Sequence, residues 1–288
     1  MKVLSGMAAW SDQTGLYPDD LPKREQLRYY SLRLPLVEVN STFHAIQPPR
    51  NFAKWAEETP EEFVMNVKAY KALTGQGKDA KGRDEIALFR AMSGSVRPLR
   101  EAGKFGCWVF QFPPWFRPGP RSESRLISIR EELAGDLVAV EVRHASWFEA
   151  GRRSETIDLL RRLGFVNVIV DEPSAELTGL TPTVAEVTNP ALAYFRLMGR
   201  DDLGRLEGEE ARKRHLAREN YRYTQADWEE LSAVVDSVAG AARVAHVIWH
   251  NNGASANAVE SAIWTARRFG SLPASRSEDQ PSLFDPSR

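Results

Sequence analysis

The sequence predicts a single-domain α/β protein built as a (β/α)8 TIM barrel. Short runs rich in β-branched residues recur along the chain, and helix-like segments separate most of them. Strands that alternate with helices form parallel βαβ units, and eight such units make a TIM barrel. An open doubly wound sheet is the alternative, but no GxGxxG motif follows the first run. The strand candidates are residues 3–7, 36–40, 63–69, 106–112, 137–143, 166–171, 193–199 and 245–251.

Helical periodicity fills most of the segments between these strands. Thr224 followed by Asp227 has the spacing of a capping box, and Ser154 is an expected N-cap. The sixth crossover, residues 172–192, is irregular because it holds too much threonine and proline for a good helix, so we expect a loop with little helix there. The predicted helices are residues 22–33, 84–102, 123–134, 154–163, 224–239 and 257–269.

Composition places the chain among soluble globular proteins. Hydrophobic residues make up 42% and charged residues 27% of the 288 residues, which is enough to bury a large core without disulfides. The single cysteine, Cys107, permits no intrachain disulfide. The apolar stretch at the N-terminus is too short for a signal peptide and no long apolar run follows, so we expect a cytoplasmic protein without a membrane partner. The net charge of −1 means that nucleic acid would need a local basic patch.

Polar residues stand at the C-terminal ends of the predicted strands. Alternate residues of a strand face opposite ways, so if Val37 and Val39 face the helices, Glu38 and Asn40 face the barrel axis. Active sites of TIM barrels lie at this end of the strands. The same alternation assigns these further residues to the inner face: Asn66, Lys68, Gln111, Glu141, Arg143, Asp171, Arg196 and Asn251.

This polar set predicts a functional site at the barrel mouth. Glu38, Glu141 and Asp171 are candidate catalytic carboxylates, and together they are also candidate ligands for Mg²⁺ or Mn²⁺. The structural alternative is a network in which acids and bases pair to satisfy the upper layer of the barrel. Basic groups can clamp a phosphate, and flat rings can stack on bases or sugars. The candidate substrate- or phosphate-binding residues are Asn40, Lys68, Gln111, Arg143, Arg196, Asn251, Trp10 and Trp147.

Histidines contribute little to this predicted site. The chain has five, none forms an HxH pair, and only His246 and His250 have the HxxxH spacing, within a predicted strand. A zinc site with several histidine ligands is therefore not expected. The alternation that places Asn251 inside assigns His246 and His250 to the outer face.

Several motifs resemble the YecE-like family, catalogued as domain of unknown function 72. They are VEVNSTFHAIQPPRNFAKWAEETPEEFVMNVKAY (37–70), QFPP (111–114), EVRHASW (141–147), YFRLMGR (194–200) and WHNNGASANAVESA (249–262). The resemblance covers residues 3 to about 270 and implies a TIM barrel, in agreement with the strand pattern. It implies no settled reaction, although the family has been likened to sugar isomerases and to the endonuclease IV superfamily. Met198 stands where the family usually has histidine, which removes one ligand or proton carrier.

The chain divides into a barrel domain, residues 1–270, and a tail, residues 271–288. The tail is rich in serine, proline and charge, so we expect disorder. Its QPSLF segment resembles the pentapeptide that binds the bacterial sliding clamp, with Gln280, Leu283 and Phe284 as the contacting residues. The alternatives are that Leu283 and Phe284 fold back onto the barrel or are incidental.

These features favour an enzyme that acts on a phosphate-containing substrate. Nucleic acid is the first choice, with nuclease-like hydrolysis or DNA-repair processing as the reaction. A sugar or sugar-phosphate isomerase or lyase is the second hypothesis, and a non-catalytic binding barrel is the third. The charged segment 201–223 is either a solvated loop or an arm over the mouth that contacts phosphate.

Overall fold

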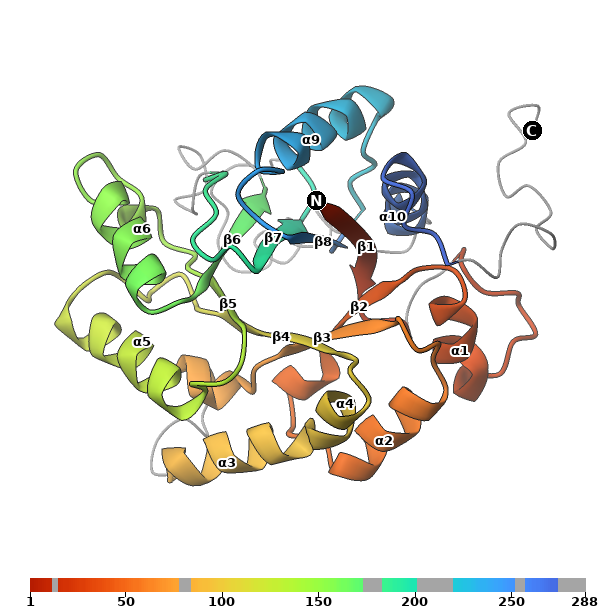
Figure 1. Ribbon diagram of the computed structural model, residues 1–288, viewed down its shortest axis with the longest axis horizontal. Helices are drawn as coiled ribbons and strands as arrows, with labels where there is room; N and C mark the ends of the chain where they lie inside the picture. Colours follow the sequence, from red (N-terminus) through yellow and green to blue (C-terminus); the bar gives the residue numbers. More distant parts are fainter. Residues whose placement is uncertain (12–14, 78–83, 173–182, 201–219, 252–256, 274–288) are drawn as a thin grey trace.

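The computed structural model is a closed barrel of eight parallel strands in sequence order (Figure 1). It describes residues 1–11, 15–77, 84–172, 183–200, 220–251 and 257–273. The predicted (β/α)8 TIM barrel is thereby confirmed. The strands are β1 (Lys2–Ala8), β2 (Leu36–Val39), β3 (Val64–Lys68), β4 (Phe105–Gln111), β5 (Val138–Glu141), β6 (Val166–Asp171), β7 (Leu192–Leu197) and β8 (Val244–Trp249).

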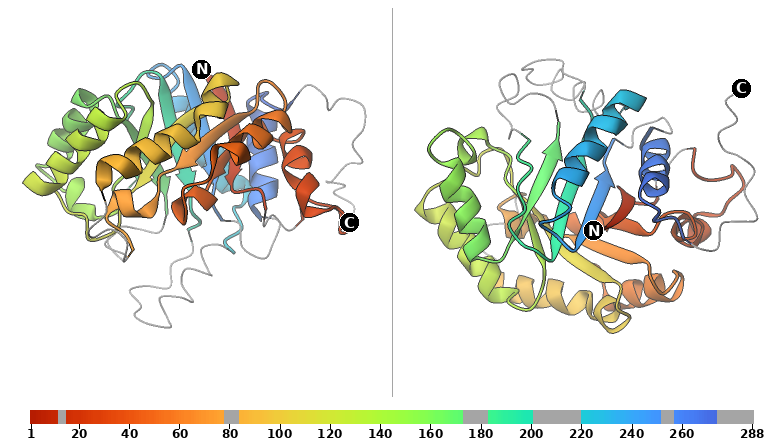
Figure 2. Two further views of the ribbon diagram at one scale, coloured as in Figure 1. Left: turned by 90° about the horizontal axis from the view of Figure 1, so that it is seen from below. Right: turned by 45° about the horizontal axis from the view of Figure 1, so that its top comes forward.

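Helices surround the strands on the outside of the barrel (Figures 1 and 2). The α-helices of the described chain are α1 (Gln26–Ser31), α2 (Pro49–Glu57), α3 (Glu85–Ser95), α4 (Arg97–Glu101), α5 (Pro120–Glu132), α6 (Arg153–Arg162), α9 (Gln225–Ser237) and α10 (Asn257–Arg268). Short 3-10 turns are η1 (Lys23–Glu25), η2 (Ser41–Phe43), η3 (Lys71–Thr74) and η5 (Ala145–Trp147). No helix within the described ranges is long and apolar enough to cross a membrane.

Helix ends explain where the sequence prediction holds and where it is wrong. The capping box is present, because the Thr224 side chain accepts from the backbone of Asp227 and the Asp227 side chain accepts in return. Ser154 is not an N-cap, since α6 already begins at Arg153. The predicted helix 84–102 is two helices, because Pro98 occupies the first turn of α4 and cannot continue α3. In the sixth crossover, residues 183–191 contain no helix, as expected.

Two apolar layers separate the inside of the barrel from the outside. The inner layer consists only of strand residues and their direct extensions, among them Leu4, Val109 and Ala139. The outer layer packs the other strand face against the helices, with Val37 and Phe110 among its strand residues. Both faces of every strand are therefore buried, as in parallel sheets in general.

Register is wrong for two of the predicted strands. In β6 the valines face the inner layer, so Asp171 lies on the outer face with Ile169. In β8 the side chains of Val247 and Trp249 face outward, so His246 lies inside the barrel. Because apolar residues line both faces of a buried strand, valine alternation alone does not reveal which face is inner.

Candidate functional site at the barrel mouth

A buried arginine organises the C-terminal end of the barrel. Arg196, near the end of β7, is 0% exposed and lies between Glu38 of β2 and Glu141 of β5. Its Nη2 is 3.0 Å from Glu38 Oε1, and its Nη1 donates to Glu141 Oε2. The remaining carboxylate oxygens also accept hydrogen bonds, from the Tyr194 hydroxyl at 2.7 Å and from Gln111 Nε2 at 2.7 Å. Both carboxylates are thus occupied by groups of the protein itself.

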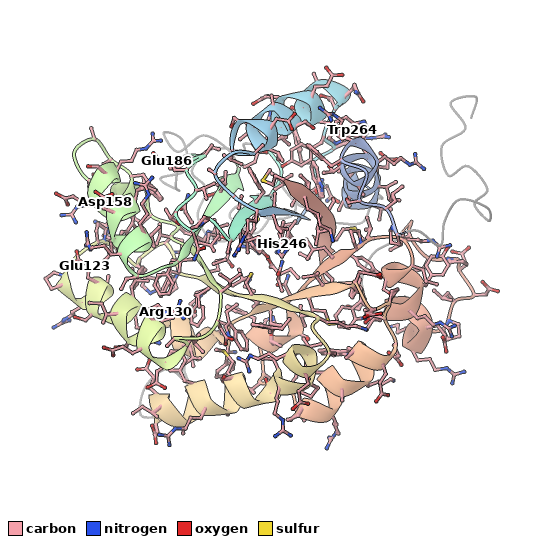
Figure 3. All side chains as sticks on the ribbon, viewed as in Figure 1. Glu123, Arg130, Asp158, Glu186, His246 and Trp264 are labelled. Atoms are coloured by element: carbon pink, nitrogen blue, oxygen red, sulfur yellow. The ribbon has the colours of Figure 1, made fainter. Side chains whose placement is uncertain are left out.

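Below this pair the network continues into the barrel. The Tyr194 hydroxyl accepts from Asn66 Nδ2 at 3.3 Å. Asn66 Oδ1 in turn lies 3.1 Å from His246 Nδ1 and accepts from the Cys107 thiol at 3.4 Å. Figure 3 labels His246 near the middle of the barrel, well inside the ring of helices. A continuous polar chain therefore runs from β8 through β3 and β7 to the ion pairs at the mouth.

Electrostatics hold these groups in fixed protonation states. Burial lowers the pKa of Arg196, but the carboxylates of Glu38 and Glu141 outweigh it and leave that pKa above its ordinary value. Burial alone would raise the pKa of Glu141, yet Arg196 and other donors keep it below its ordinary value. Burial lowers the pKa of His246 to about 3, so this imidazole is neutral at pH 7. The network is ionised at its top and neutral at its base.

Lys68, at the end of β3, lies beside the network but is not hydrogen-bonded to it. Within the described residues its ammonium makes no hydrogen bond and no ion pair, and Nζ lies 4.6 Å from the centre of the Phe43 ring. Burial and the positive charge of Arg196 lower the pKa of Lys68 to about 8. Glu38 and Glu141 oppose this shift only in part. Near pH 8 this buried amine is therefore neutral in a substantial fraction of the molecules.

Arg143, which follows β5, is a second cation with spare hydrogen-bonding capacity. Its Nε lies 3.6 Å from Glu141 Oε1 and its Nη2 lies 3.8 Å from Glu172 Oε2, so both contacts are longer than hydrogen bonds. Its buried Nε has no hydrogen-bond partner among the described residues. The side chain remains 20% exposed, and its charge acts on Lys68. Lys68 and Arg143 therefore present unsatisfied donors at the same end of the barrel.

A small cavity lies beside this region at the ends of β1 and β2. It measures about 270 Å³, and Trp10, Asn40 and His44 line it. The Asn40 amide nitrogen is 3.5 Å from His250 Nε2, while the Asn40 Oδ1 has no partner in the described part of the chain. Ala9 has a left-handed backbone, with a φ of 63°. Such a conformation in a non-glycine residue costs free energy and is frequent near functional sites.

Most of the predicted inward residues meet at the mouth, as the strand pattern indicated. These are Glu38, Asn66, Lys68, Gln111, Glu141, Arg143 and Arg196. Asp171 does not join them. Its carboxylate accepts from the Tyr223 hydroxyl at 2.8 Å and from Arg200 Nε at 2.9 Å, and Arg200 also pairs with Asp227 at the start of α9. Asp171 thus anchors β6 to the outer shell.

Asn251 and Trp147 also lie outside the group that meets at the mouth. Asn251 is buried and donates to the backbone carbonyl of Tyr221 at 2.8 Å. Trp147 is buried, stacks on Phe116 and donates to the carbonyl of Phe116 at 2.7 Å. Its ring packs the core and has no open face for a substrate. Trp10 lines the cavity, although its ring also packs edge-on against Trp55 at 5.0 Å.

Three residues of the site escaped the sequence prediction. Tyr194 precedes Arg196 by two positions. Alternate residues of a strand face the same side, so the inward position of Arg196 implies that Tyr194 also faces inward. His246 and His250 were predicted to face outward, and this prediction is wrong. It followed from placing Asn251 on the inner face of β8. Nothing in the sequence distinguishes the two registers of this strand.

The predicted carboxylate metal site does not form. Asp171 faces the helices, and all four oxygens of Glu38 and Glu141 already accept hydrogen bonds within the barrel. Within the described part of the chain, no group of three or more His, Cys, Asp or Glu side chains is arranged to hold a metal ion. Because Asp171 lies on the other strand face from Glu38 and Glu141, these three residues do not meet as one ligand set for Mg²⁺ or Mn²⁺. The pentapeptide with Gln280, Leu283 and Phe284 lies outside the described residues, and sliding-clamp binding stays a prediction.

Together, the fold and the mouth define a TIM-barrel protein with a buried, ionised network at its C-terminal end. Comparisons with known proteins give the family. A family profile described as "Protein of unknown function DUF72" matches residues 4–283. The UPF0759 protein YunF of Bacillus subtilis (strain 168) is 30% identical over 251 residues, which cover 87% of this chain and 89% of that protein. The chain belongs to the DUF72 family, which confirms the resemblance seen in its motifs.

Solved structures of the same family agree with this assignment. A DUF72 family protein of Enterococcus faecalis is 29% identical, with a TM-score of 0.85 over 98% of this chain and 100% of that chain. A DUF72 family protein of Thermotoga maritima is 28% identical, with a TM-score of 0.78 over 94% of this chain and 100% of that chain. Family membership thus extends over the whole barrel.

A first prediction concerns Arg196. Arg196→Met should lower the free energy of unfolding by about 3–5 kcal/mol, because it leaves Glu38 and Glu141 as buried carboxylates without their counter-ion. Arg143→Met, at a partly exposed position where the described residues provide no hydrogen bond, should cost at most about 1 kcal/mol. Chemical denaturation of both variants at pH 7 measures the difference. Equal stability of Arg196→Met and the wild type would show that the network is not a structural requirement.

A second prediction concerns Lys68. Its pKa is about 8 in the folded protein and 10.5 in the reference state, so below pH 8 both states are charged and the folded state bears the full cost of burial. Lys68→Met should therefore raise the free energy of unfolding at pH 7 by about 1–3 kcal/mol. Between pH 8 and 10.5 the folded lysine loses its proton while the unfolded lysine retains it, so this gain should shrink and then vanish.

Lys104 provides the matched control for this measurement. It is also buried, but its ammonium donates to the carbonyl oxygens of Ala56 at 2.5 Å and Thr59 at 2.7 Å. Lys104→Met removes these hydrogen bonds and should lower stability. Denaturation curves between pH 7 and 11 test both variants. If Lys68→Met is as destabilising as Lys104→Met, Lys68 has partners that satisfy its charge.

Proposed function

We propose that the protein is an enzyme whose active site is the C-terminal mouth of the barrel, and that Lys68 and Arg143 bind the phosphate of its substrate. The observation that carries this proposal is the pair of cations with unsatisfied donors. Arg143 makes only long ion-pair contacts, and Lys68 makes no hydrogen bond or ion pair among the described residues. Two charged donors left unsatisfied near one another lower the stability of the isolated protein, and an anion would restore their hydrogen bonds.

The chemistry assigned to this site is proton transfer by Lys68. A general base works best when its pKa is near the working pH, and burial brings the pKa of Lys68 to about 8. Glu38 and Glu141 were the first candidates for that role from the sequence. Their oxygens are occupied by Arg196, Tyr194 and other donors, so in this proposal they hold the site in place and set its charge.

A small phosphorylated molecule, such as a sugar phosphate, is the substrate class that we place first. Nucleic acid was the first choice from the sequence because the tail resembles a sliding-clamp-binding motif, with carboxylates for a metal and aromatic rings for bases or sugars at the mouth. Asp171 and Trp147 do not contribute to the mouth, which removes two of the features that favoured it. The cavity beside Asn40 and Trp10 has room for the remainder of a small substrate.

A third prediction tests this function directly. Inorganic phosphate should raise the melting temperature of the wild type, with a smaller rise in Arg143→Met and in Lys68→Met. Sugar phosphates, nucleotides, and labelled DNA and RNA are then assayed with and without Mn²⁺. We expect turnover of a phosphorylated small molecule, reduced about 100-fold or more in Lys68→Met, as for loss of a general base.

Lys104→Met serves as the control variant and should retain activity at a temperature where it is folded. Arg143→Met should raise KM more than it lowers kcat, because it binds a part of the substrate that does not react. Absence of any phosphate-dependent shift in the wild type would contradict the proposal. Cleavage of DNA or RNA without turnover of small phosphates would instead restore nucleic acid as the substrate.

A further inference from the structure

Lys68 occupies a position that suits a nucleophile as well as a base. It is the last residue of β3, so its side chain starts at the end of the barrel where the proposed substrate binds. Its side chain is 8% exposed, and the ring of Phe43 lies on one side of Nζ. Its backbone is fixed, because the Thr42 hydroxyl donates to its carbonyl oxygen. The backbone of Lys68 is held in place, and within the described residues its nitrogen makes no hydrogen bond or ion pair.

Comparison with Lys104 shows what is unusual about this amine. Lys104 is buried to a similar degree, but its ammonium donates to two carbonyl oxygens and to the Thr59 hydroxyl, at 3.2 Å for the last. Those bonds use its protons and lock it as a structural cation. Among the described residues the Lys68 ammonium makes no such hydrogen bonds, so its lone pair becomes available once the proton leaves.

We propose that the Lys68 amine forms an imine with an aldehyde or ketone group of the substrate, while Arg143 binds the anionic group of the same molecule. This inference rests on the proposed function, because it uses the same mouth and the same anion contact. It adds a substrate class, a carbonyl compound that bears a phosphate. It also replaces simple proton transfer by covalent catalysis.

The step balances without an added oxidant or reductant. The neutral nitrogen of Lys68 attacks the carbonyl carbon and forms a carbon–nitrogen bond, which gives a carbinolamine. Both protons of the amine then leave with the carbonyl oxygen as water, and a carbon–nitrogen double bond remains. Protonation of this imine yields a cation that withdraws electrons from the adjacent carbon and makes its proton acidic.

Neighbouring charges suit both stages of this reaction. Burial and Arg196 lower the pKa of Lys68 to about 8, so the nucleophilic form is populated near neutral pH. Glu38 and Glu141 act on the same nitrogen in the opposite direction and favour a positive charge there. They are held by Arg196 and can stabilise the protonated imine without moving.

Reductive trapping tests the proposal. The full-length protein is mixed with glycolaldehyde phosphate and sodium borohydride, which reduces an imine to a stable secondary amine, and peptide mass spectrometry locates the modified lysines. Uncharged glycolaldehyde is the matched probe. We expect Lys68 to be modified at least tenfold faster than Lys71 or Lys104 with the phosphate probe, and the rate to increase with pH up to about 8 and then level off.

Variants separate recognition from reactivity. Arg143→Met should remove the preference for glycolaldehyde phosphate over glycolaldehyde, and Lys104→Met should leave the trapping at Lys68 unchanged. Lys68→Arg keeps the positive charge and should abolish trapping at this site while retaining part of the phosphate-dependent thermal shift. Modification of Lys68 no faster than that of Lys71 would overturn the imine.

The phosphate-dependent thermal shift distinguishes this failure from failure of the proposed function. A shift that depends on Arg143, without trapping at Lys68, refutes the imine and leaves the phosphate site standing. Absence of both the shift and the trapping refutes the two together.

Discussion

The position of one guanidinium group determines the arrangement of the barrel mouth. Arg196 is fully buried and can be tolerated there only because Glu38 and Glu141 flank it on two sides. Those carboxylates come from strands on different parts of the ring, so the three charges connect β2, β5 and β7. Gln111 and Tyr194 complete their hydrogen bonds. Every carboxylate oxygen of the network accepts a hydrogen bond, whereas the buried Nε of Arg196 has no hydrogen-bond partner among the described residues.

This arrangement determines which polar groups at the barrel mouth keep hydrogen-bonding capacity for a substrate. Because all four carboxylate oxygens accept hydrogen bonds from the protein, both carboxylates are held in fixed positions. The positive centre of the network lies close enough to Lys68 to lower the pKa of that amine. Lys68 and Arg143 are left with hydrogen-bonding capacity that the protein does not satisfy among the described residues. The buried charge of Arg196 thus contributes to the lowered pKa of the neighbouring Lys68.

Strand alternation was sufficient to predict which residues form this network, but it also included a residue that does not belong to it. The rule worked in β2, β5 and β7, where Glu38, Glu141 and Arg196 all face the axis as expected. The rule failed for Asp171. Valines face inward in β6 but outward in β5, so the position of the valines does not tell the inner face of a strand from its outer face. Hydrogen bonds from Arg200 satisfy Asp171 on the outside, and that partner follows β7, too far along the chain to be anticipated.

The closed barrel itself was predictable, since it depends on the count and spacing of apolar runs rather than on any single residue. That the Lys68 ammonium makes no hydrogen bond or ion pair among the described residues was not predictable. A lysine at the end of a strand is compatible with an ion pair, and only the structure shows that the nearby carboxylates pair with Arg196. Which side chains remain unsatisfied is a property of the folded arrangement, and sequence patterns carry no record of it.

Lys68 is a buried amine whose charge is matched by no hydrogen bond or ion pair among the described residues. The most direct measurement is an NMR titration of the lysine Cε and Nζ resonances in protein labelled at lysine, with Lys68→Arg to assign the signal. We expect an apparent pKa of about 8 for Lys68, and a higher value when phosphate is bound. A pKa near 10.5 in the free protein, unchanged by phosphate, would contradict it.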